Sequence, residues 1–351
     1  DESEQLNAFA AELSRADWLV LDTEADSLHA YPEKLCLLQF GLPGRLELVD
    51  PLAGVDLRPV FGALAERELV MHGSDYDVRL LRAGHDFVPT TVFDTMLAAR
   101  LTGHEKFGLA DLVQKHLGVE LEKGSQKANW AKRPLTERMV EYALNDVRYL
   151  EPLSQRLRVL LDKMGRLKWH RQICARMVEE NSHLVEPDLD RVWRLKGSSK
   201  LPPRSLAVLR ELWHWRESEA LRRCRPPFFV LSHDLMVRLA TSACNGGEWQ
   251  ELVPRRLSDN RRRALVEAIH RGRDLPSTEH PEPIKPPPRR SISMEQKRRL
   301  ESLQRQRDQQ AEILELDPTL IASRAELIGL AVNAEENVDR MLPWQLEQLG
   351  V

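Results

Sequence analysis

The segment WLVLDTE, residues 18–24, predicts a buried strand that ends in two acidic residues. Its short apolar run is bounded by charged residues, which is typical of a strand inside a domain. Side chains alternate between the two faces of a strand, so Asp22 and Glu24 leave the same face. Burying two neighbouring carboxylates is unfavourable unless a cation or a proton offsets their charge. The segment therefore predicts either a site for a hard divalent cation or a strand end with two solvated acids.

Two later segments add acidic residues to this pair. Asp77 lies in MHGSDYDVRLL and Asp146 lies in EYALNDVRYL. Tyr142 precedes Asp146 by four residues in a segment with helical periodicity, so the two side chains share one helix face. A phenol beside a metal-binding carboxylate orients a water molecule without adding charge. The alternative is a tyrosine packed on the core with its hydroxyl at the rim.

The remaining pattern predicts a sheet followed by helices. Apolar stretches predict strands at 18–21, 35–42, 46–49 and 69–71, and the turn at Pro43-Gly44 favours an antiparallel start. Helical periodicity follows at 75–84, 94–102, 109–117 and 136–163. After Gly165 the pattern is helical, with connections that contain proline. The expected fold class is an α/β domain with a mixed sheet flanked by helices, followed by all-α domains.

Taken in order, these segments resemble the three motifs of the DEDD exonuclease superfamily, in the DEDDy subclass, whose third motif has a tyrosine four residues before the last aspartate. The closer resemblance is to the ribonuclease D family and the related catalytic domain of the nuclear exosome exonuclease. The chain departs from the family pattern at Ala25-Asp26 and at Asn129. The matching residues are Asp22-Thr23-Glu24, Tyr31-Pro32, Leu37-Leu38-Gln39, His72-Gly73-Ser74, Asp77, Phe93-Asp94-Thr95, Trp130, Arg133-Pro134-Leu135-Thr136, Tyr142 and Asp146.

The resemblance implies a ribonuclease-H-like fold and a catalytic site for two divalent metal ions, Mg²⁺ or Mn²⁺. Two such ions activate a water molecule and neutralise the leaving oxygen during phosphodiester hydrolysis, and all-oxygen ligands favour these metals. The implied metal ligands are Asp22, Glu24, Asp77 and Asp146, with Asp22 as the bridge, and Tyr142 positions the attacking water. The histidines and the four cysteines show no zinc-binding spacing.

Other residues near these motifs are expected to cap a helix or contact substrate rather than bind metal. We interpret Asp94 as a helix N-cap rather than a ligand, and the resemblance favours Asp77 over Asp75. Contacts with substrate are expected from Thr23, His72, Trp130 and Arg133. The alternatives are a structural hydrogen bond for the histidine and a surface-packed tryptophan.

The net charge of −3 is divided unevenly along the chain. Residues 1–150 contain 16 basic and 25 acidic residues, whereas residues 194–275 contain 17 basic and 9 acidic residues. Such a basic region is typical of a phosphate-binding surface, and the alternative is a solvated helix face. The arginines expected to bind nucleic acid are Arg222, Arg223, Arg261, Arg262 and Arg263.

Residues 204–275 resemble an HRDC domain, a small helical module found beside ribonuclease D and RecQ-type helicases. Shifting the C-terminal segment by 91 residues gives eight identical pairs, among them Pro227 with Pro318 and Ser232 with Ser323. We interpret the C-terminus as a second, divergent copy of the module, and the alternative is shared helical periodicity alone. The predicted boundaries are an exonuclease domain at 1–165, a connector at 166–200, an HRDC domain at 201–275, a proline-rich linker at 276–290 and a second HRDC-like domain at 291–351.

Composition limits the classes of protein. The 351 residues are 42% hydrophobic and 30% charged, which is typical of globular domains. No apolar run approaches the roughly 18 residues of a membrane span, so we expect no membrane partner. Four cysteines without paired spacing favour a reducing cytoplasm, and we expect a monomer.

The sequence therefore predicts a 3′-5′ exoribonuclease that releases 5′-mononucleotides. The resemblance implies that its partners are RNA, namely tRNA precursors and other small structured RNAs whose 3′ ends it matures. A Werner-type 3′-5′ DNA exonuclease is the first alternative, because contacts to the 2′-hydroxyl are not visible in a sequence. The second alternative is a non-catalytic RNA-binding protein.

Overall fold

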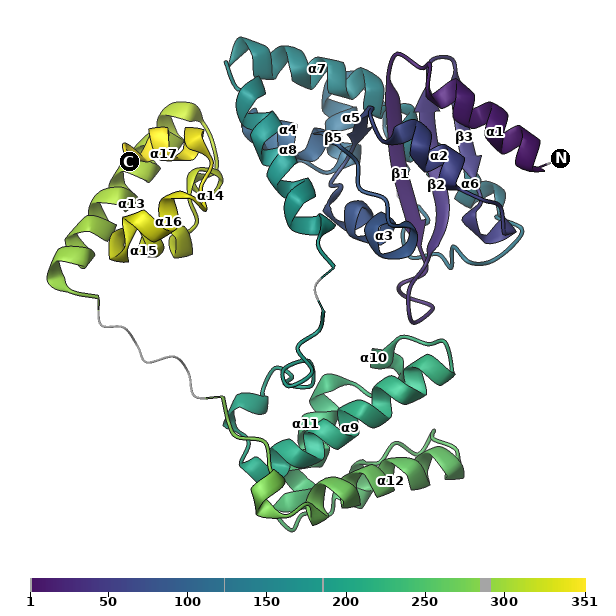
Figure 1. The fold of residues 1–351 in the computed structure, drawn as a ribbon, viewed down its shortest axis with the longest axis vertical. Coiled ribbons are helices and arrows are strands. Elements are labelled where there is room, and N and C mark those ends of the chain that lie inside the picture. Colours follow the sequence, from purple (N-terminus) through teal and green to yellow (C-terminus); the bar gives the residue numbers. More distant parts are fainter. Residues whose placement is uncertain (1, 123, 185, 285–291) are drawn as a thin grey trace. The chain divides into compact units, whose positions relative to one another are not determined.

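The computed structural model describes residues 2–122, 124–184, 186–284 and 292–351 (Figure 1). The chain divides into two compact units. Unit 1 comprises Asp1–Ala25, Leu35–Leu184 and Ser291–Val351, and unit 2 comprises Asp26–Lys34 and Val185–Arg290. The domain boundaries drawn from the sequence stay predictions, and residues 285–290 of the expected linker lie outside the described residues.

Unit 1 contains a five-stranded mixed sheet. Its strands are β1 (Leu19–Ala25), β2 (Leu35–Leu42), β3 (Arg45–Val49), β4 (Glu68–Met71) and β5 (Thr91–Asp94), in the order β3-β2-β1-β4-β5. The pairs β1 with β2 and β2 with β3 are antiparallel, whereas β4 is parallel to both β1 and β5. The predicted fold class is confirmed. The sequence pattern missed β5 because only two of its residues, Val92 and Phe93, are apolar.

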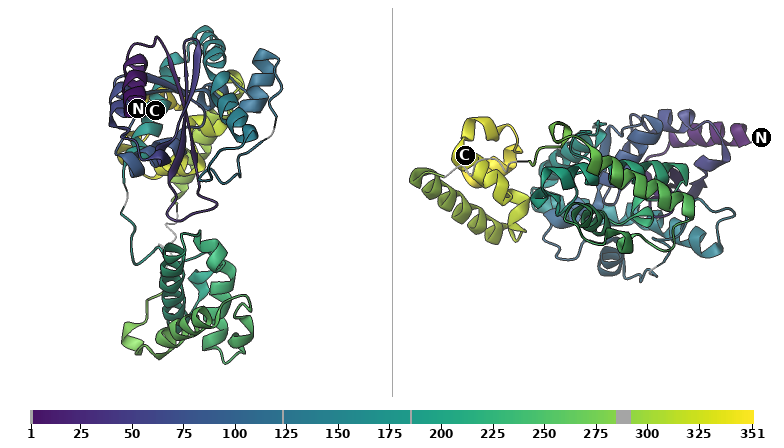
Figure 2. Two further views of the ribbon diagram at one scale, coloured as in Figure 1. Left: turned by 90° about the vertical axis from the view of Figure 1, so that its right-hand side faces the viewer. Right: turned by 90° about the horizontal axis from the view of Figure 1, so that it is seen from below.

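Helices cover both faces of this sheet (Figure 2). Leu19 and Leu21 of β1 share a core with the helices α1 (Glu2–Leu13), α2 (Arg58–Leu64) and α3 (Asp75–His85). Val20, between them, shares a core with α7 (Leu150–Lys163), and α6 (Glu137–Arg148) packs on β1, β2 and β3. Strand alternation therefore sends Asp22 and Glu24 to the face of Val20, where α6 lies.

The remaining helices of this domain are α4 (Thr95–Leu101), α5 (Leu109–Leu117) and α8 (Leu167–Ser182), with a 3₁₀ turn, η1, at Pro51–Ala53. The segment 136–163, predicted as one helix, forms α6 and α7, which meet at Tyr149. Helical periodicity continues across this joint, so the pattern alone does not reveal it. The described residues contain no helix both long and apolar enough to span a membrane.

Unit 2 is helical. It contains α9 (Pro203–Arg222), α10 (Pro227–Val230), α11 (His233–Cys244) and α12 (Asp259–Asp274), with the short 3₁₀ turns η2 (Ser198–Lys200), η3 (Trp249–Leu252) and η4 (Ser277–Glu279). Leucines and alanines of α9, α11 and α12 share one core. The β1–β2 loop belongs to this unit, since the Tyr31 hydroxyl donates a hydrogen bond of 2.7 Å to Glu217 on α9.

The C-terminal helices repeat the start of unit 2. They are α13 (Met294–Leu314), α14 (Pro318–Ile321), α15 (Arg324–Val332), α16 (Ala334–Val338) and α17 (Pro343–Leu349). The helices α13, α14 and α15 begin 91 residues after α9, α10 and α11, respectively. Ser232 and Ser323 are N-caps at equivalent positions, before α11 and α15. This correspondence supports the interpretation of a repeated module.

The C-terminal module packs against the exonuclease domain within unit 1. The rings of Trp169 and Trp344 stack with their centroids 4.5 Å apart. The buried guanidinium of Arg166 donates to the carbonyl oxygens of Leu101 and Leu314, at 2.7 Å each. An arginine with two backbone partners of this kind fixes the distance between the two segments, because leaving its charge buried without acceptors is costly.

Close helix packing in unit 2 makes Gly272 of α12 sensitive to substitution. A Cβ atom at this position would lie 2.5 Å from the Cα of Val208 on α9. Gly272→Ala should therefore force the helices apart and destabilise unit 2 by about 1–3 kcal/mol, seen as faster amide hydrogen exchange in α9 and α12. Gly84→Ala in α3 is the control, since a Cβ there meets no atom within 4 Å. Unchanged protection of α9 in Gly272→Ala would contradict the packing described here.

Candidate active site

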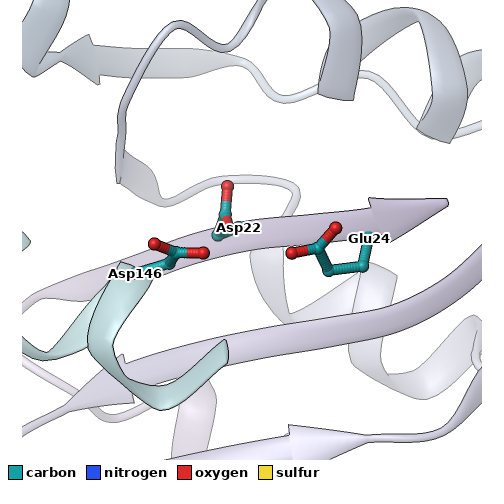
Figure 3. A group of neighbouring side chains, drawn as sticks. All are labelled: Asp22, Glu24 and Asp146. Carbon is teal, nitrogen blue, oxygen red and sulfur yellow. The ribbon is translucent and has the colours of Figure 1, made fainter. Parts of the chain in front are cut away.

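Three carboxylates meet where β1 passes α6. Asp22 and Glu24 come from β1, and Asp146 comes from the last turn of α6 (Figure 3). Each offers a ligand oxygen, and these atoms lie within 4.8 Å of one another. The side chains are half-buried, so solvent and a ligand can reach them. Among the described residues, this is the one such group of acidic, histidine or cysteine side chains.

Asp77, the fourth predicted acid, is held beside this group. It lies in the first turn of α3, is 6% exposed, and accepts a hydrogen bond from the Thr23 hydroxyl. Thr23 stands between Asp22 and Glu24 on β1 and therefore points to the opposite face. The charge of Asp77 nevertheless acts on Asp22, whose pKa it raises. The structure thus brings Asp22, Glu24 and Asp146 within ligand distance of one another, and places Asp77 close enough for its charge to act on Asp22.

Asp94 positions the start of α3 and thereby Asp77. One oxygen of its carboxylate accepts hydrogen bonds from the backbone N–H and the hydroxyl of Ser74, at 2.8 Å each. The other accepts from the N–H groups of Met96 and Leu97 at the start of α4, at 2.8 and 3.0 Å. The predicted N-cap is confirmed. Its side chain also joins two helices, which sequence spacing does not show.

Burial raises the pKa values of all four acids, and the charges of neighbouring acids raise those of Asp22, Glu24 and Asp77 further. Desolvation is the largest cause for each of them. The pKa of Asp22 is raised well above its usual value, that of Glu24 to about 9, that of Asp146 to about 7 and that of Asp77 to about 6. The cluster therefore resists full ionisation near neutral pH unless a positive charge enters it. Because all four donors are carboxylate oxygens, they fit hard divalent cations such as Mg²⁺ or Mn²⁺.

Tyr142 lies one helical turn before Asp146 and donates a hydrogen bond to its carboxylate. Desolvation and the charge of Asp146 raise the pKa of the phenol above its usual value, so the hydroxyl keeps its proton at neutral pH. The Trp130 ring supports it, with ring centroids 6.0 Å apart. Gly124 passes close to the other side, since a Cβ atom there would lie 2.6 Å from the tyrosine ring.

Three residues predicted to contact substrate, His72, Trp130 and Arg133, are engaged in contacts within the protein. Nδ1 of His72 forms a hydrogen bond of 2.8 Å with the Thr95 hydroxyl, which agrees with the structural alternative. Trp130 is 1% exposed, so its ring face is covered in this structure. The guanidinium of Arg133 is bound to Asp50 and to the carbonyl oxygens of Trp130 and Cys36. Binding of RNA by the last two side chains would require them to leave these positions, so their predicted role stays a prediction.

Gln39 is a site residue that the motif analysis did not single out. It lies directly opposite Asp22 on β2 and is 0% exposed. Neither atom of its side-chain amide has a hydrogen-bond partner among the described residues. A buried amide without partners is costly, so this group is available to Asp22 or to a ligand held by it. The signal in the sequence was a polar residue inside the otherwise apolar strand LCLLQFGL.

The arginines predicted to bind nucleic acid lie in unit 2. Arg222 of α9 and Arg261 of α12 both bind the Glu219 carboxylate, at 2.6 and 2.8 Å. Arg262 donates to the carbonyl oxygen of Arg255, and Arg263 pairs with Asn260. Arg223 is exposed at the end of α9. The two predicted groups, 39 residues apart in the sequence, therefore meet at one carboxylate.

Comparison with known proteins agrees with this geometry. Residues 1–162 match the family of 3′-5′ exonuclease domains, and residues 205–244 match the HRDC domain. The chain is 35% identical to ribonuclease D of Shewanella sp. over 67% of its length and 61% of the relative, and 29% identical to ribonuclease D of Desulfotalea psychrophila over 93% and 88%.

The chain is thus similar to ribonuclease D along nearly its whole length. The crystal structure of Escherichia coli RNase D superposes with a TM-score of 0.73, 24% identity and coverage of 98% of this chain and 97% of that one, which shows a common fold. The Shewanella alignment spans less than two thirds of that relative's length.

The raised pKa values of the acids make the stability of this protein depend on pH when no metal is bound. Above about pH 4.5 the unfolded chain has released protons that the folded site still holds. Stability should therefore be highest at low pH and fall as the pH rises through about 6, 7 and 9, the values for Asp77, Asp146 and Glu24. Melting temperatures between pH 5 and pH 9 in EDTA check this, with Asp22→Asn/Glu24→Gln as the comparison that should flatten the trend.

Millimolar Mg²⁺ or Mn²⁺ should raise the melting temperature of the wild type, and more so at high pH, since the cation replaces protons. The double variant should gain little. A melting temperature that metal leaves unchanged, in protein shown to be metal-free beforehand, would rule out the proposed cation site.

Proposed function

We propose that this protein is a 3′-5′ exoribonuclease that hydrolyses RNA from its 3′ end and releases 5′-mononucleotides. The observation that carries the proposal is the convergence of four acids from β1, α3 and α6, with a protonated tyrosine hydrogen-bonded to one of them. The names of its relatives support RNA as the substrate, rather than the DNA of a Werner-type exonuclease.

Asp22, Glu24, Asp77 and Asp146 would hold two divalent ions, Mg²⁺ or Mn²⁺, with Asp22 as the bridging ligand. Bound there, two ions supply a nucleophilic water at neutral pH and neutralise the charge on the leaving 3′-oxygen. The protein keeps the four carboxylates ionised only in the presence of this positive charge. Thr23 holds Asp77 in place through its hydroxyl, and Gln39 offers an amide next to Asp22.

Tyr142 would position the attacking water. Its hydroxyl group donates its proton in a hydrogen bond to Asp146, so the lone pairs of the oxygen can accept a hydrogen bond from water. The raised pKa of the phenol excludes a role as a base near neutral pH. The tyrosine therefore contributes orientation, and the ionised carboxylates contribute charge.

We further propose that the substrates are tRNA precursors and other small structured RNAs, and that the protein acts as a monomer in the cytoplasm. The helical modules beside the exonuclease domain support recruitment of structured RNA, since unit 2 carries the arginine groups described above. The four cysteines, all in the described part of the chain, form no disulfide, which agrees with a reducing compartment.

Substitutions at the site should separate these roles. Asp22→Asn and Asp146→Asn should each reduce the rate of hydrolysis of 5′-labelled RNA in Mg²⁺ by several orders of magnitude, because each removes a ligand charge. Tyr142→Phe should reduce it by about 10²- to 10³-fold, as expected for loss of water orientation. Asp75→Asn is a matched control, since Asp75 is exposed and paired with Arg79, and its rate should stay within about twofold of the wild type.

The same assay tests the alternatives. A matched DNA strand should be degraded more slowly than RNA, and EDTA should stop both reactions. Near-normal hydrolysis by Asp22→Asn would refute the site, faster hydrolysis of DNA would favour the Werner-type alternative, and no hydrolysis of either strand would favour a non-catalytic RNA-binding protein.

A further inference from the structure

The repeated module allows one structural corner to be compared in two settings. In the first copy the corner joins α9 to α10, at residues 222–229, and in the second it joins α13 to α14, at residues 313–320. Both contain one residue in the left-handed backbone region, Cys224 with φ 46° and Glu315 with φ 52°, again 91 residues apart. The two corners therefore share a backbone path, and their side chains can be compared position by position.

In the second copy this corner docks on the exonuclease domain of unit 1. The carbonyl oxygen of Leu314 accepts the hydrogen bond from Arg166 at 2.7 Å. A Cβ atom at Gly103 would lie 2.7 Å from the carbonyl oxygen of Glu315, so the two backbones approach closely. Leu316 and Leu320 are buried in the core that this module shares with the domain. The corner is a contact surface, and the side chains that it packs against the domain are those of Leu314, Leu316 and Leu320.

The first copy places different chemistry on the same corner. Arg223, Arg225 and Phe229 occupy the positions of Leu314, Leu316 and Leu320. Phe228 is 49% exposed and Phe229 is 52% exposed, although both are large apolar side chains. These three positions are buried or half-buried in the second copy and exposed in the first, with arginine and phenylalanine in place of leucine.

The two rings form a small, rigid platform. Their centroids are 4.5 Å apart with an interplanar angle of 44°, and the Arg225 guanidinium lies 5.8 Å from the centre of the Phe229 ring. Pro226 and Pro227 precede the rings and restrict the backbone that carries them. Little conformational entropy would be lost when a flat ligand covers such a platform.

The surroundings of the rings are strongly basic. Residues 221–229 contain three arginines and no acidic residue. Glu219, 8% exposed, binds both Arg222 and Arg261, which brings the arginines at the start of α12 next to the corner. One carboxylate cannot neutralise Arg222, Arg223, Arg225 and Arg261 together, so the platform lies in a positive field suited to a polyanion.

We propose that this corner binds a single-stranded segment of RNA, with bases stacking on Phe228 and Phe229 and phosphates contacting Arg222, Arg223 and Arg225. Exposed aromatic rings beside arginines are the features that bind single-stranded nucleic acid with little sequence preference. The inference rests on the proposed function for the identity of the nucleic acid. A protein partner could also cover exposed phenylalanines, but the concentration of arginine favours the polyanion.

Binding of a fluorescein-labelled uridine oligomer to the full chain in EDTA tests this proposal without any hydrolysis. Phe228→Ala/Phe229→Ala should weaken binding by at least about fivefold, the loss expected for one stacked base, and leave the slope of log K against log salt unchanged. Arg222→Gln/Arg223→Gln/Arg225→Gln should instead lower that slope by about 0.7 for each lost phosphate contact.

Two control variants separate stacking from other effects. Leu221→Ala removes another exposed apolar side chain of the same surface, 50% exposed but without a ring, and should bind within about twofold of the wild type. Phe228→Trp/Phe229→Trp retains stacking rings and should restore affinity. The double alanine variant should also hydrolyse an RNA dinucleotide at the wild-type rate in Mg²⁺, because the rings lie outside the catalytic site.

Two results would overturn the proposal: binding by Phe228→Ala/Phe229→Ala within twofold of the wild type, or an equal loss in Leu221→Ala. The second result would indicate an apolar docking surface for a protein. A wild-type chain that binds the oligomer through its rings but hydrolyses no RNA would refute the proposed function and leave the platform intact, so the two failures are distinguishable.

Discussion

The candidate site depends on one physical constraint, which is that carboxylates held close together in a desolvated site repel one another. Asp22 and Glu24 share one face of β1 because strand side chains alternate, and that face is the one that α6 covers. The same alternation sends Thr23 to the other face, where its hydroxyl secures Asp77. Desolvation then raises the pKa of every acid in the cluster. The fold thus builds a site that is electrostatically incomplete without a cation.

The two helical modules share one backbone arrangement but present different side chains on the same corner. Their helices begin at equivalent positions, yet three positions of the corner after the first helix are leucines packed against the exonuclease domain in the second copy, and arginine or phenylalanine in the first. Exchanging leucine for arginine and phenylalanine changes the partner that this surface suits while leaving the helices in place. This divergence also explains why only eight pairs of residues remain identical between the copies.

Much of the fold and the acidic cluster could be predicted from the sequence, because local periodicity encodes them. Period 2 placed Asp22 and Glu24 together, and helical spacing placed Tyr142 beside Asp146. The residues whose surroundings the sequence did not reveal are those whose partners are distant in the chain. Arg133 is held by Asp50 and the carbonyl of Cys36, and Trp130 is buried against Tyr142, so neither presents the exposed face that its residue type suggested. Gln39, although part of a matching motif, received no role from the sequence for the same reason, since only the pairing of β1 with β2 brings it opposite Asp22.

The central claim is that cation binding replaces protons held by the four acids. Calorimetric titration of metal-free protein with Mn²⁺ at pH 7.5, in two buffers of different ionisation enthalpy, measures this exchange directly. Because the pKa of Glu24 is raised to about 9 and that of Asp146 to about 7, binding should release on the order of one proton or more, and Asp22→Asn should bind far more weakly. Binding that releases no proton, or that is unchanged in Asp22→Asn, would contradict the account.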